Sequence, residues 1–161
     1  ISNAPLTFRY MRVSMQFVVY DPFHTPTEEK INALVDFLVE SLGEYGDPAH
    51  QIRKCVGFAL REYESFGGFV IEMRDDSGVL GVSVVNQTGM SEYVPENLLV
   101  YIAVRQNSRG LGLGSALLQE TVNRAKGNLA LHVEPDNPAR RLYERNGFSS
   151  KYIEMRLYKE G

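Results

Sequence analysis

A glycine-rich segment follows an apolar run of strand length in the middle of the chain. The run is Leu98–Val104, and Gly110, Gly112 and Gly114 then stand at alternate positions before a helical pattern begins. Glycine lets the backbone approach a bulky anion, and a helix N-terminus adds about half a positive charge. The segment therefore predicts a cradle for a pyrophosphate group, with a flexible turn as the alternative. It lacks the Lys-Ser/Thr pair of a P-loop and the glycine spacing of a dinucleotide fingerprint.

A second segment near the end of the chain has the start and stop signals of a short helix. It runs from Asn137 to Phe148 and follows another apolar run, Leu129–Val133. Asn137 precedes a proline, a pair typical of a helix start, and Gly147 is typical of a helix end. The apolar runs and helical segments predict a mixed sheet. In such a sheet, ligands favour the carboxyl end of a strand that leads into a helix. We therefore expect the ligand beside Val104.

In these two segments the chain resembles the GCN5-related N-acetyltransferase (GNAT) superfamily. The resemblance rests on Val104–Leu118 and Asn137–Phe148 and, with the strand between them, covers about a third of the chain. It implies an α/β (α+β) fold with a mixed, mostly antiparallel central sheet flanked by about four helices. It also implies an acyltransferase that moves an acetyl group from acetyl-CoA to a primary amine of a small molecule or peptide, by direct attack in a ternary complex.

The resemblance assigns residues to the acetyl-CoA site. In the family, the end of the fourth strand binds the pantetheine and the acetyl carbonyl, which here implies Ile102, Ala103 and Val104. The family's pyrophosphate loop corresponds to Arg109, Gly110, Leu111, Gly112, Leu113, Gly114 and Ser115. Asn137 matches an asparagine near the pantetheine arm. The commoner family spacing from asparagine to tyrosine is one residue longer, which leaves Asp136 as the alternative.

Transfer to an amine by direct attack needs a base, because an alkylammonium has a pKa near 10 and must lose a proton first. Some relatives carry a glutamate on the fourth strand, but here Leu98 falls near that position. Other relatives use a carboxylate on the fifth strand, where this chain offers His132 and then Glu134; Glu96 is a weaker candidate, and a chain of water molecules is a further alternative. A histidine in a strand is also a common structural hydrogen-bonding residue, so this assignment stays open.

The remaining steps need a hydrogen-bond donor and an acid. A backbone N–H such as that of Val104 could stabilise the charge that develops on the thioester oxygen. Tyr143 matches the family tyrosine beside the cofactor sulfur, and a phenol with a pKa of about 10 can protonate a departing thiolate. Tyr143 could instead be a core aromatic residue. A catalytically weak acyl-CoA-binding sensor or interaction module is the alternative function, and a longer acyl chain is a further one.

Periodicity predicts a single domain over residues 8–161, with residues 1–7 interpreted as a tag remnant.

The acceptor site is expected from the helices within Thr27–Phe66 and the loop Thr88–Glu96, where Glu40, Glu44 and Glu92 could attract an ammonium. The other expected elements are a strand Phe8–Tyr20, a helix capped by Thr25–Glu28 with proline first and ending at Gly43 or Gly46, a helix from Asp47 through Tyr63, a hairpin of Phe69–Arg74 and Val79–Val85, a helix from Leu113 to Ala125, and a final strand Phe148–Tyr158.

Composition limits the partners. The formal net charge is −3, which argues against nucleic acid or an anionic membrane as the main partner. Cys55 is the one cysteine and the three histidines have no ligand spacing, so we expect no metal and interpret Cys55 as a small core residue. The absence of a long apolar run or a signal-like start predicts a cytoplasmic protein. A homodimer through aromatics of the opening or final strand is left open.

Overall fold

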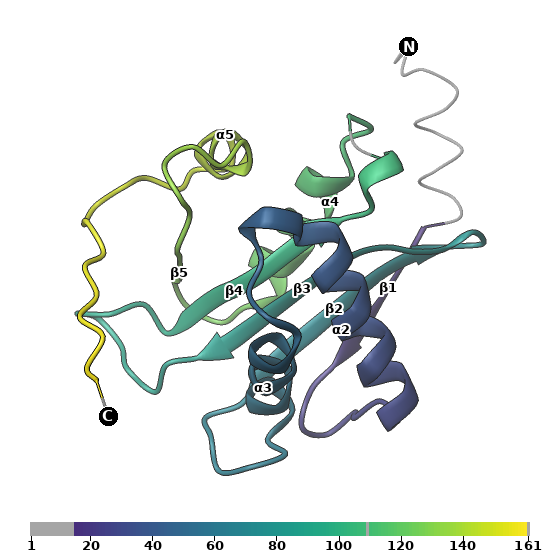
Figure 1. Ribbon diagram of the computed structural model, residues 1–161, viewed down its shortest axis with the longest axis horizontal. Coiled ribbons are helices and arrows are strands. Elements are labelled where there is room, and N and C mark those ends of the chain that lie inside the picture. Colours follow the sequence, from purple (N-terminus) through teal and green to yellow (C-terminus); the bar gives the residue numbers. More distant parts are fainter. Residues whose placement is uncertain (1–14, 109, 161) are drawn as a thin grey trace.

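A five-stranded sheet in the order β1-β2-β3-β4-β5 forms the centre of the computed structural model, which describes residues 15–108 and 110–160 (Figure 1). All neighbouring strands are antiparallel except β4 and β5, which are parallel, so the expected mixed, mostly antiparallel sheet is confirmed. The first half of the predicted opening strand lies outside the described residues. The strands are β1 Gln16–Tyr20, β2 Gly68–Asp75, β3 Gly78–Gln87, β4 Asn97–Val104 and β5 Leu129–Leu131.

Helices cover both faces of this sheet and give it two hydrophobic cores. Alternate residues of a strand point to opposite faces, so Val70 packs under the first two helices while its neighbour Ile71 packs under the last two. No helix within the described part of the chain is long and apolar enough to cross a membrane. The helices are α2 Glu28–Leu42, α3 Ala49–Leu60, α4 Leu113–Arg124 and α5 Ala139–Arg145, with short 3₁₀ turns η1 Gly43–Tyr45 and η2 Gln106–Ser108.

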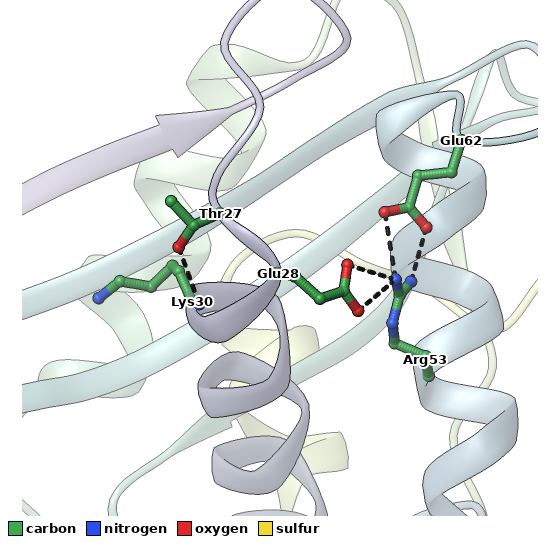
Figure 2. A network of polar contacts seen from close by, with 5 residues as sticks. All are labelled: Thr27, Glu28, Lys30, Arg53 and Glu62. Atoms are coloured by element: carbon green, nitrogen blue, oxygen red, sulfur yellow. Dashed lines mark hydrogen bonds and ion pairs between the residues drawn. The ribbon is translucent and has the colours of Figure 1, made fainter.

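The start of α2 differs from the prediction by two residues. The hydroxyl of Thr27, and not that of Thr25, accepts a hydrogen bond from the backbone N–H of Lys30 at 3.2 Å (Figure 2). Pro26 therefore precedes the cap instead of occupying the first helical position. The prediction was wrong because Thr25 and Thr27 are both cap-forming residues, and only packing of the apolar stripe decides which one caps the helix.

Arg53 on α3 joins the two helices of this face. Its guanidinium lies 2.7 Å from a carboxylate oxygen of Glu62 and 3.1 Å from one of Glu28 on α2 (Figure 2). Such partly exposed pairs contribute little stability each. Their main effect here is geometric, because they hold α2 and α3 together. The η1 connection between these two helices lies at the carboxyl end of β4.

The second helix is shorter than its apolar stripe predicts. It ends at Leu60, and Arg61 adopts a left-handed conformation with a φ of 56°. Tyr63 therefore lies beyond the helix, 41% exposed, and its hydroxyl donates a hydrogen bond to the carbonyl of Lys54. The apolar spacing continues as far as Tyr63, but the left-handed backbone at Arg61 ends the helix before that residue.

The predicted final strand is absent from the described residues. Residues 149–160 form neither helix nor strand, and the end of the chain lies outside the sheet (Figure 1). The alternation from Tyr152 to Tyr158 is that of a strand, but a strand also needs a neighbour for its backbone hydrogen bonds. No neighbouring strand of the described protein supplies them.

Candidate active site

The sheet opens where β4 and β5 separate. The two strands pair only near their starts, and Leu99 with Leu131 is their last pair. β5 ends there, although the apolar pattern predicted it as far as Val133, while β4 continues to Val104. The β5-facing edge of the second half of β4 therefore has no strand partner among the described residues.

A bulge in β4 lies at the start of this opening. On β3, Val84 faces Tyr101 and its neighbour Val85 faces Leu99, so Val100 is an extra residue in β4. A bulge bends its strand and increases the local twist. This bend accounts for the divergence of β4 from β5, and nothing in the amino-acid pattern of the run indicated it.

Strand geometry shows which backbone groups face the opening. The N–H of Arg105 donates to the carbonyl of Leu80 on β3 at 2.8 Å. Since backbone groups alternate in direction along a strand, the N–H groups of Ile102 and Val104 point away from β3, toward the opening. The N–H group of Ala103 points toward β3, so this group is not directed at a ligand in the opening. Two of the three predicted strand residues thus present amides to an extended ligand.

The glycine-rich loop continues from the end of β4. Arg109 lies outside the described residues. Gly110 and Gly112 have positive φ angles of 83° and 78°, conformations that favour glycine. A side chain added at Gly110 would meet no atom within 4 Å, so the loop faces open space at this point. Leu111 between them is 44% exposed, which places it on the surface of the loop.

The first turn of α4 presents unpaired donors. Its first helical hydrogen bond runs from the N–H of Ala116 to the carbonyl of Gly112, and no side chain caps the helix. The N–H groups of Leu113, Gly114 and Ser115 consequently have no acceptor within the helix. Three such donors at the positive end of a 12-residue helix have the geometry that suits an anion.

Helix α5 packs against this same turn and carries the candidate acid. A Cβ on Gly114 would lie 3.2 Å from Leu142, which is close contact and explains the small residue there. Tyr143 belongs to the same hydrophobic cluster as Ile102 and Val104 and stacks edge-on against Phe148. Burial raises its pKa to about 12. Tyr143 is therefore both a core aromatic residue, 9% exposed, and a neighbour of the opening.

Asn137 lies one residue before the N-cap of α5, which is Pro138 and not Asn137 as the sequence predicted. Its side-chain oxygen accepts a hydrogen bond from the N–H of Ala139 at 2.9 Å. This contact engages the oxygen and leaves the side-chain NH₂ group available. Asn137 can therefore donate two hydrogen bonds from this group, which suits a ligand that presents carbonyl groups.

The η1 connection between α2 and α3 approaches the opening from the face of the sheet that α2 and α3 cover, opposite to the face under α4 and α5. The hydroxyl of Tyr45 donates to the backbone carbonyl of Asp136, after β5, at 3.4 Å. The hydroxyl of Tyr101, on β4, donates to the carboxylate of Asp47. Burial and this carboxylate raise the pKa of Tyr101. Sequence reasoning had treated Asp47 only as a helix start, because the chain separation of this pair gives no local signal.

Several carboxylates gather at this connection. Desolvation, followed by the negative charges of Asp136, Glu44 and Glu134, raises the pKa of Tyr45. Asp47 adds a further carboxylate on the same side. Of the three glutamates expected to attract an ammonium, Glu44 thus lies near the opening. An electronegative surface of this kind favours a cationic ligand.

The three candidate bases occupy different surroundings. His132 is exposed, and its ring Nδ1 lies 3.2 Å from a guanidinium nitrogen of Arg156, which can only donate. The neutral ring then carries its proton on Nε2 and has no free acceptor in this arrangement. Glu134 is exposed and near Tyr45. The structure therefore leaves the Glu134 carboxylate the freer of the two groups after β5.

Glu96 lies at the other end of β4. The backbone N–H of Asn128 donates to its carboxylate and lowers its pKa. The eight residue steps from Glu96 to Val104 span about 25 Å in an extended strand. The whole loop Thr88–Glu96, with Glu92, lies at that same far end, because it joins the end of β3 to the start of β4. Glu96 is consequently remote from the opening.

The thiol of Cys55 is expected to be unreactive in the native protein. It packs beside the core under α2 and α3, accepts a hydrogen bond from Asn86, and burial raises its pKa to about 12. Compared with a free thiol of pKa about 8.5, the thiolate fraction at pH 8 falls by about 10³-fold. Labelling with a disulfide reagent should therefore be slow in buffer and fast in urea. Equal rates under the two conditions would contradict the buried position.

Within residues 15–108 and 110–160, no three histidine, cysteine, aspartate or glutamate side chains are grouped so that they could hold a metal ion. The recognisable features of the site are thus an unpaired strand edge, the donor-rich first turn of α4 and a buried phenol on α5. All are main-chain or aromatic groups at one end of the sheet.

Solved structures with the same fold span nearly the whole chain. A protein assigned to the GNAT family from Desulfovibrio desulfuricans superposes with a TM-score of 0.67 at 24% identity, over 92% of this chain and 93% of its own. A GNAT-family acetyltransferase from Streptococcus pneumoniae gives a TM-score of 0.64 at 14% identity, over 91% and 99%. A histone acetyltransferase HPA2-related protein from Corynebacterium glutamicum gives 0.61 at 22%, over 89% and 90%.

Sequence comparison identifies the family directly. A comparison with curated protein sequences gives no match. The family description Acetyltransferase (GNAT) domain matches residues 53–150, more than half of the chain. The matched range contains β4, the glycine-rich loop, α4, β5 and α5, the elements that surround the opening. The chain belongs to the GNAT superfamily of acetyltransferases.

Proposed function

We propose that this enzyme transfers the acetyl group of acetyl-CoA to a primary amine of a small molecule or peptide, by direct attack in a ternary complex. GNAT acetyltransferases use acetyl-CoA as co-substrate. The observation that carries the proposal is the opening beside Val104, which an unpaired strand edge, the free amides of α4 and the side chain of Tyr143 all border.

The residues present fit coenzyme A. The free N–H groups of Leu113, Gly114 and Ser115, beside the open space at Gly110, suit its pyrophosphate. Arg109, assigned by the family pattern, would add a positive charge. Ile102 and Val104 would pair with the amides of the pantetheine arm as a neighbouring strand would. The side-chain NH₂ group of Asn137 would donate to a carbonyl of that arm.

The chemistry then divides among three groups of the chain. Bound acetyl-CoA supplies a thioester carbonyl as the electrophile. The Glu134 carboxylate accepts a proton from the ammonium, directly or through water, with His132 as the alternative once Arg156 releases its ring. The N–H of Val104 stabilises negative charge on the carbonyl oxygen. The Tyr143 hydroxyl donates its proton to the departing sulfur, and the second proton that the nitrogen loses on forming the amide restores this hydroxyl, so that an amide and a free thiol result.

The charge distribution favours a cationic acceptor. Glu44, Asp47, Glu134 and Asp136 lie on the side where the connection between α2 and α3 meets the loop after β5. No lysine or arginine of the described residues forms an ion pair with any of these four carboxylates. Their field would concentrate an ammonium near the opening before it is deprotonated.

Release of free thiol from acetyl-CoA with a panel of amines tests the proposal. Diamines and lysine-containing peptides are expected to exceed amino acids of similar size in kcat/KM by about tenfold or more at low salt, and less at high salt. Glu44→Gln should reduce this preference, whereas Glu92→Gln, at the far end of the sheet, should not. Tight coenzyme A binding without turnover of any amine would favour the alternative function, an acyl-CoA-binding sensor.

A further inference from the structure

A groove crosses the end of the sheet opposite to the opening, where β1 and β3 end and β2 and β4 begin. Its volume is about 530 Å³. The strand register places it there, because Gly68 at the start of β2 lies opposite Asn86, and Gln87 at the end of β3 lies opposite Asn97. We name it the far groove. Its lining includes Val19, Phe23, Phe69, Arg61, Arg124 and Lys126.

Part of the lining of the far groove is apolar and aromatic. Val19 and Phe69 belong to the hydrophobic cluster under α4, and Phe69 is 8% exposed. Phe23 and Phe66 also line the groove and are 90% and 63% exposed. Sites for small molecules have volumes of about 300–1,000 Å³ and are lined mostly by apolar and aromatic side chains. The far groove therefore suits a small molecule with a ring or another apolar body.

Three cations also line the far groove. Arg61 and Lys126 form no ion pair with any carboxylate of the described residues. Arg124 has only Glu120, on the preceding turn of α4, at 3.8 Å. Cations that gather in a groove concentrate anions there. The local charge is thus opposite in sign to the formal net charge of the chain, which is −3.

The carboxylates near these cations have other partners. Asp21, which also lines the groove, accepts hydrogen bonds from two backbone N–H groups of its own turn. Glu62, after α3, forms an ion pair with Arg53. Glu96, just before β4, accepts a hydrogen bond from the backbone N–H of Asn128. These contacts leave the cations of the far groove to an anionic ligand.

The backbone conformation at Arg61 is unusual for its residue type. Arg61 ends α3 in a left-handed conformation with a φ of 56°, which favours glycine. A Cβ added at Gly67 would lie 3.1 Å from the Cγ of Arg61 and 3.3 Å from the ring of Pro22. The stem of the arginine therefore packs beside the turn after β1. This packing holds its side chain at the groove, and backbone strain of this kind is often found at functional sites.

Asn97 fixes the backbone of a second cation. It is 2% exposed, and its side-chain NH₂ group donates to the backbone carbonyl of Lys126 at 2.7 Å and to that of Asn128 at 3.3 Å. These hydrogen bonds join the segment after α4 to the start of β4. A site whose charged groups are already positioned binds a ligand at a smaller entropic cost.

The helix ends at the far groove favour one class of anion. Arg61 follows α3 and Arg124 ends α4, so the groove borders the C-terminal ends of two helices. A helix C-terminus carries about half a negative charge, whereas phosphate sites are commonly built on helix N-termini. A doubly charged phosphate is therefore less suited to this groove than a singly charged carboxylate, which an arginine can bind through two parallel hydrogen bonds.

We propose that the far groove binds a small organic carboxylate that carries an aromatic ring or a similar apolar body. The carboxylate lies among Arg61, Arg124 and Lys126, and the ring packs against Val19 and Phe69. Burial of the ring supplies the hydrophobic part of the affinity, and the charged hydrogen bonds orient the ligand. The length of β4 separates this site from the opening.

Binding of three aryl carboxylates tests the proposal: benzoate, phenylacetate and phenylpropionate, which differ in the distance from ring to carboxylate. At least one is expected to bind with a millimolar or lower Kd and to shift the NMR signals of the backbone amides of Arg61, Phe69 and Lys126. Its uncharged amide, and acetate without the ring, should bind at least about tenfold more weakly. No shift at the groove with any of the three, or equal affinity for the amide, would overturn the proposal.

Arg61→Gly separates binding from folding. Glycine removes the guanidinium and suits a φ of 56°, so thermal stability should equal or exceed that of the wild type. Affinity for the tightest of the three probes should nevertheless fall by about tenfold or more. Lys126→Gln should weaken binding similarly and keep the main-chain contact with Asn97. Lys54→Gln on α3 is the matched control, because it removes the same charge outside the groove. Unchanged affinity in both groove variants would exclude this site.

Titration of the same probe in the presence of coenzyme A tests whether the two sites are separate. The Kd of the probe should change by less than about twofold, because the sites lie at opposite ends of the sheet. Loss of probe binding would show that the probe occupies the opening, and would overturn the proposal. If the chain fails to bind coenzyme A, the proposed function fails, but the NMR shifts and the variants still decide on the far groove.

Discussion

The Tyr143→Phe variant is expected to lose about 10²- to 10⁴-fold in kcat and to keep the dissociation constant for coenzyme A of the wild type. The hydroxyl is the group that would protonate the leaving thiolate, and the ring is the group that packs against Phe148. Phenylalanine removes the first and keeps the second. Thiol-release kinetics and calorimetric titration with coenzyme A measure the two quantities separately.

A structural role of Tyr143 predicts a different result. If the residue only fills the core, phenylalanine should leave kcat nearly unchanged, and that outcome would remove Tyr143 from the mechanism. Leu142→Ala is the matched control on the neighbouring position, because Leu142 packs against Gly114 and carries no proton. It should weaken coenzyme A binding and lower stability by about 1–2 kcal/mol, less than for a fully buried leucine because Leu142 is half-buried, without a selective loss of kcat.

The pH dependence of these effects follows from the direction of the shift. Burial raises the pKa of Tyr143 to about 12, so the free enzyme keeps its proton well above pH 10. Activity that depends on this acid should not decline between pH 8 and 10. An unfolded tyrosine loses its proton near pH 10, so the stability contributed by protonated Tyr143 is complete below pH 10 and is lost toward pH 12. Tyr143→Phe should show a smaller loss of stability over that interval.

The second large effect is expected in the glycine-rich loop. Gly110→Asp should weaken coenzyme A binding by about 100-fold, and Gly110→Ala by about tenfold. Both variants place a Cβ on a residue with a φ of 83°, which costs about 1–2 kcal/mol outside glycine. Aspartate adds a negative charge beside the pyrophosphate, which costs a further 1–2 kcal/mol or about another factor of ten.

A series at this one position separates strain from charge. Gly110→Lys has the same backbone strain as Gly110→Ala but the opposite charge from Gly110→Asp, so its affinity should equal or exceed that of the alanine variant. The difference between aspartate and alanine should decrease as salt is added, because exposed charges are screened. Equal dissociation constants for all three variants would show that the pyrophosphate does not bind at this loop.

Much of the fold follows from local sequence patterns. The hairpin, the strand Asn97–Val104 and the helix after the glycine-rich loop lie where periodicity and turn residues predict them, because their hydrogen bonds and buried stripes involve residues close in sequence. Local patterns did not decide between neighbouring positions for the start of a helix. Thr25 and Thr27 are both good cap residues, and only packing favours the second.

The amino-acid sequence by itself determined that a strand leads into a glycine-rich helix start and that a short helix carrying Tyr143 follows Asn137, since each is a property of neighbouring residues. Only the tertiary structure decided that β4 bulges at Val100 and leaves β5, and that Asp47 meets Tyr101. It also decided that residues 149–160 pair with no strand of the described part of the chain. These features depend on which backbone edges and side chains meet across long chain separations, and no local pattern carries that information.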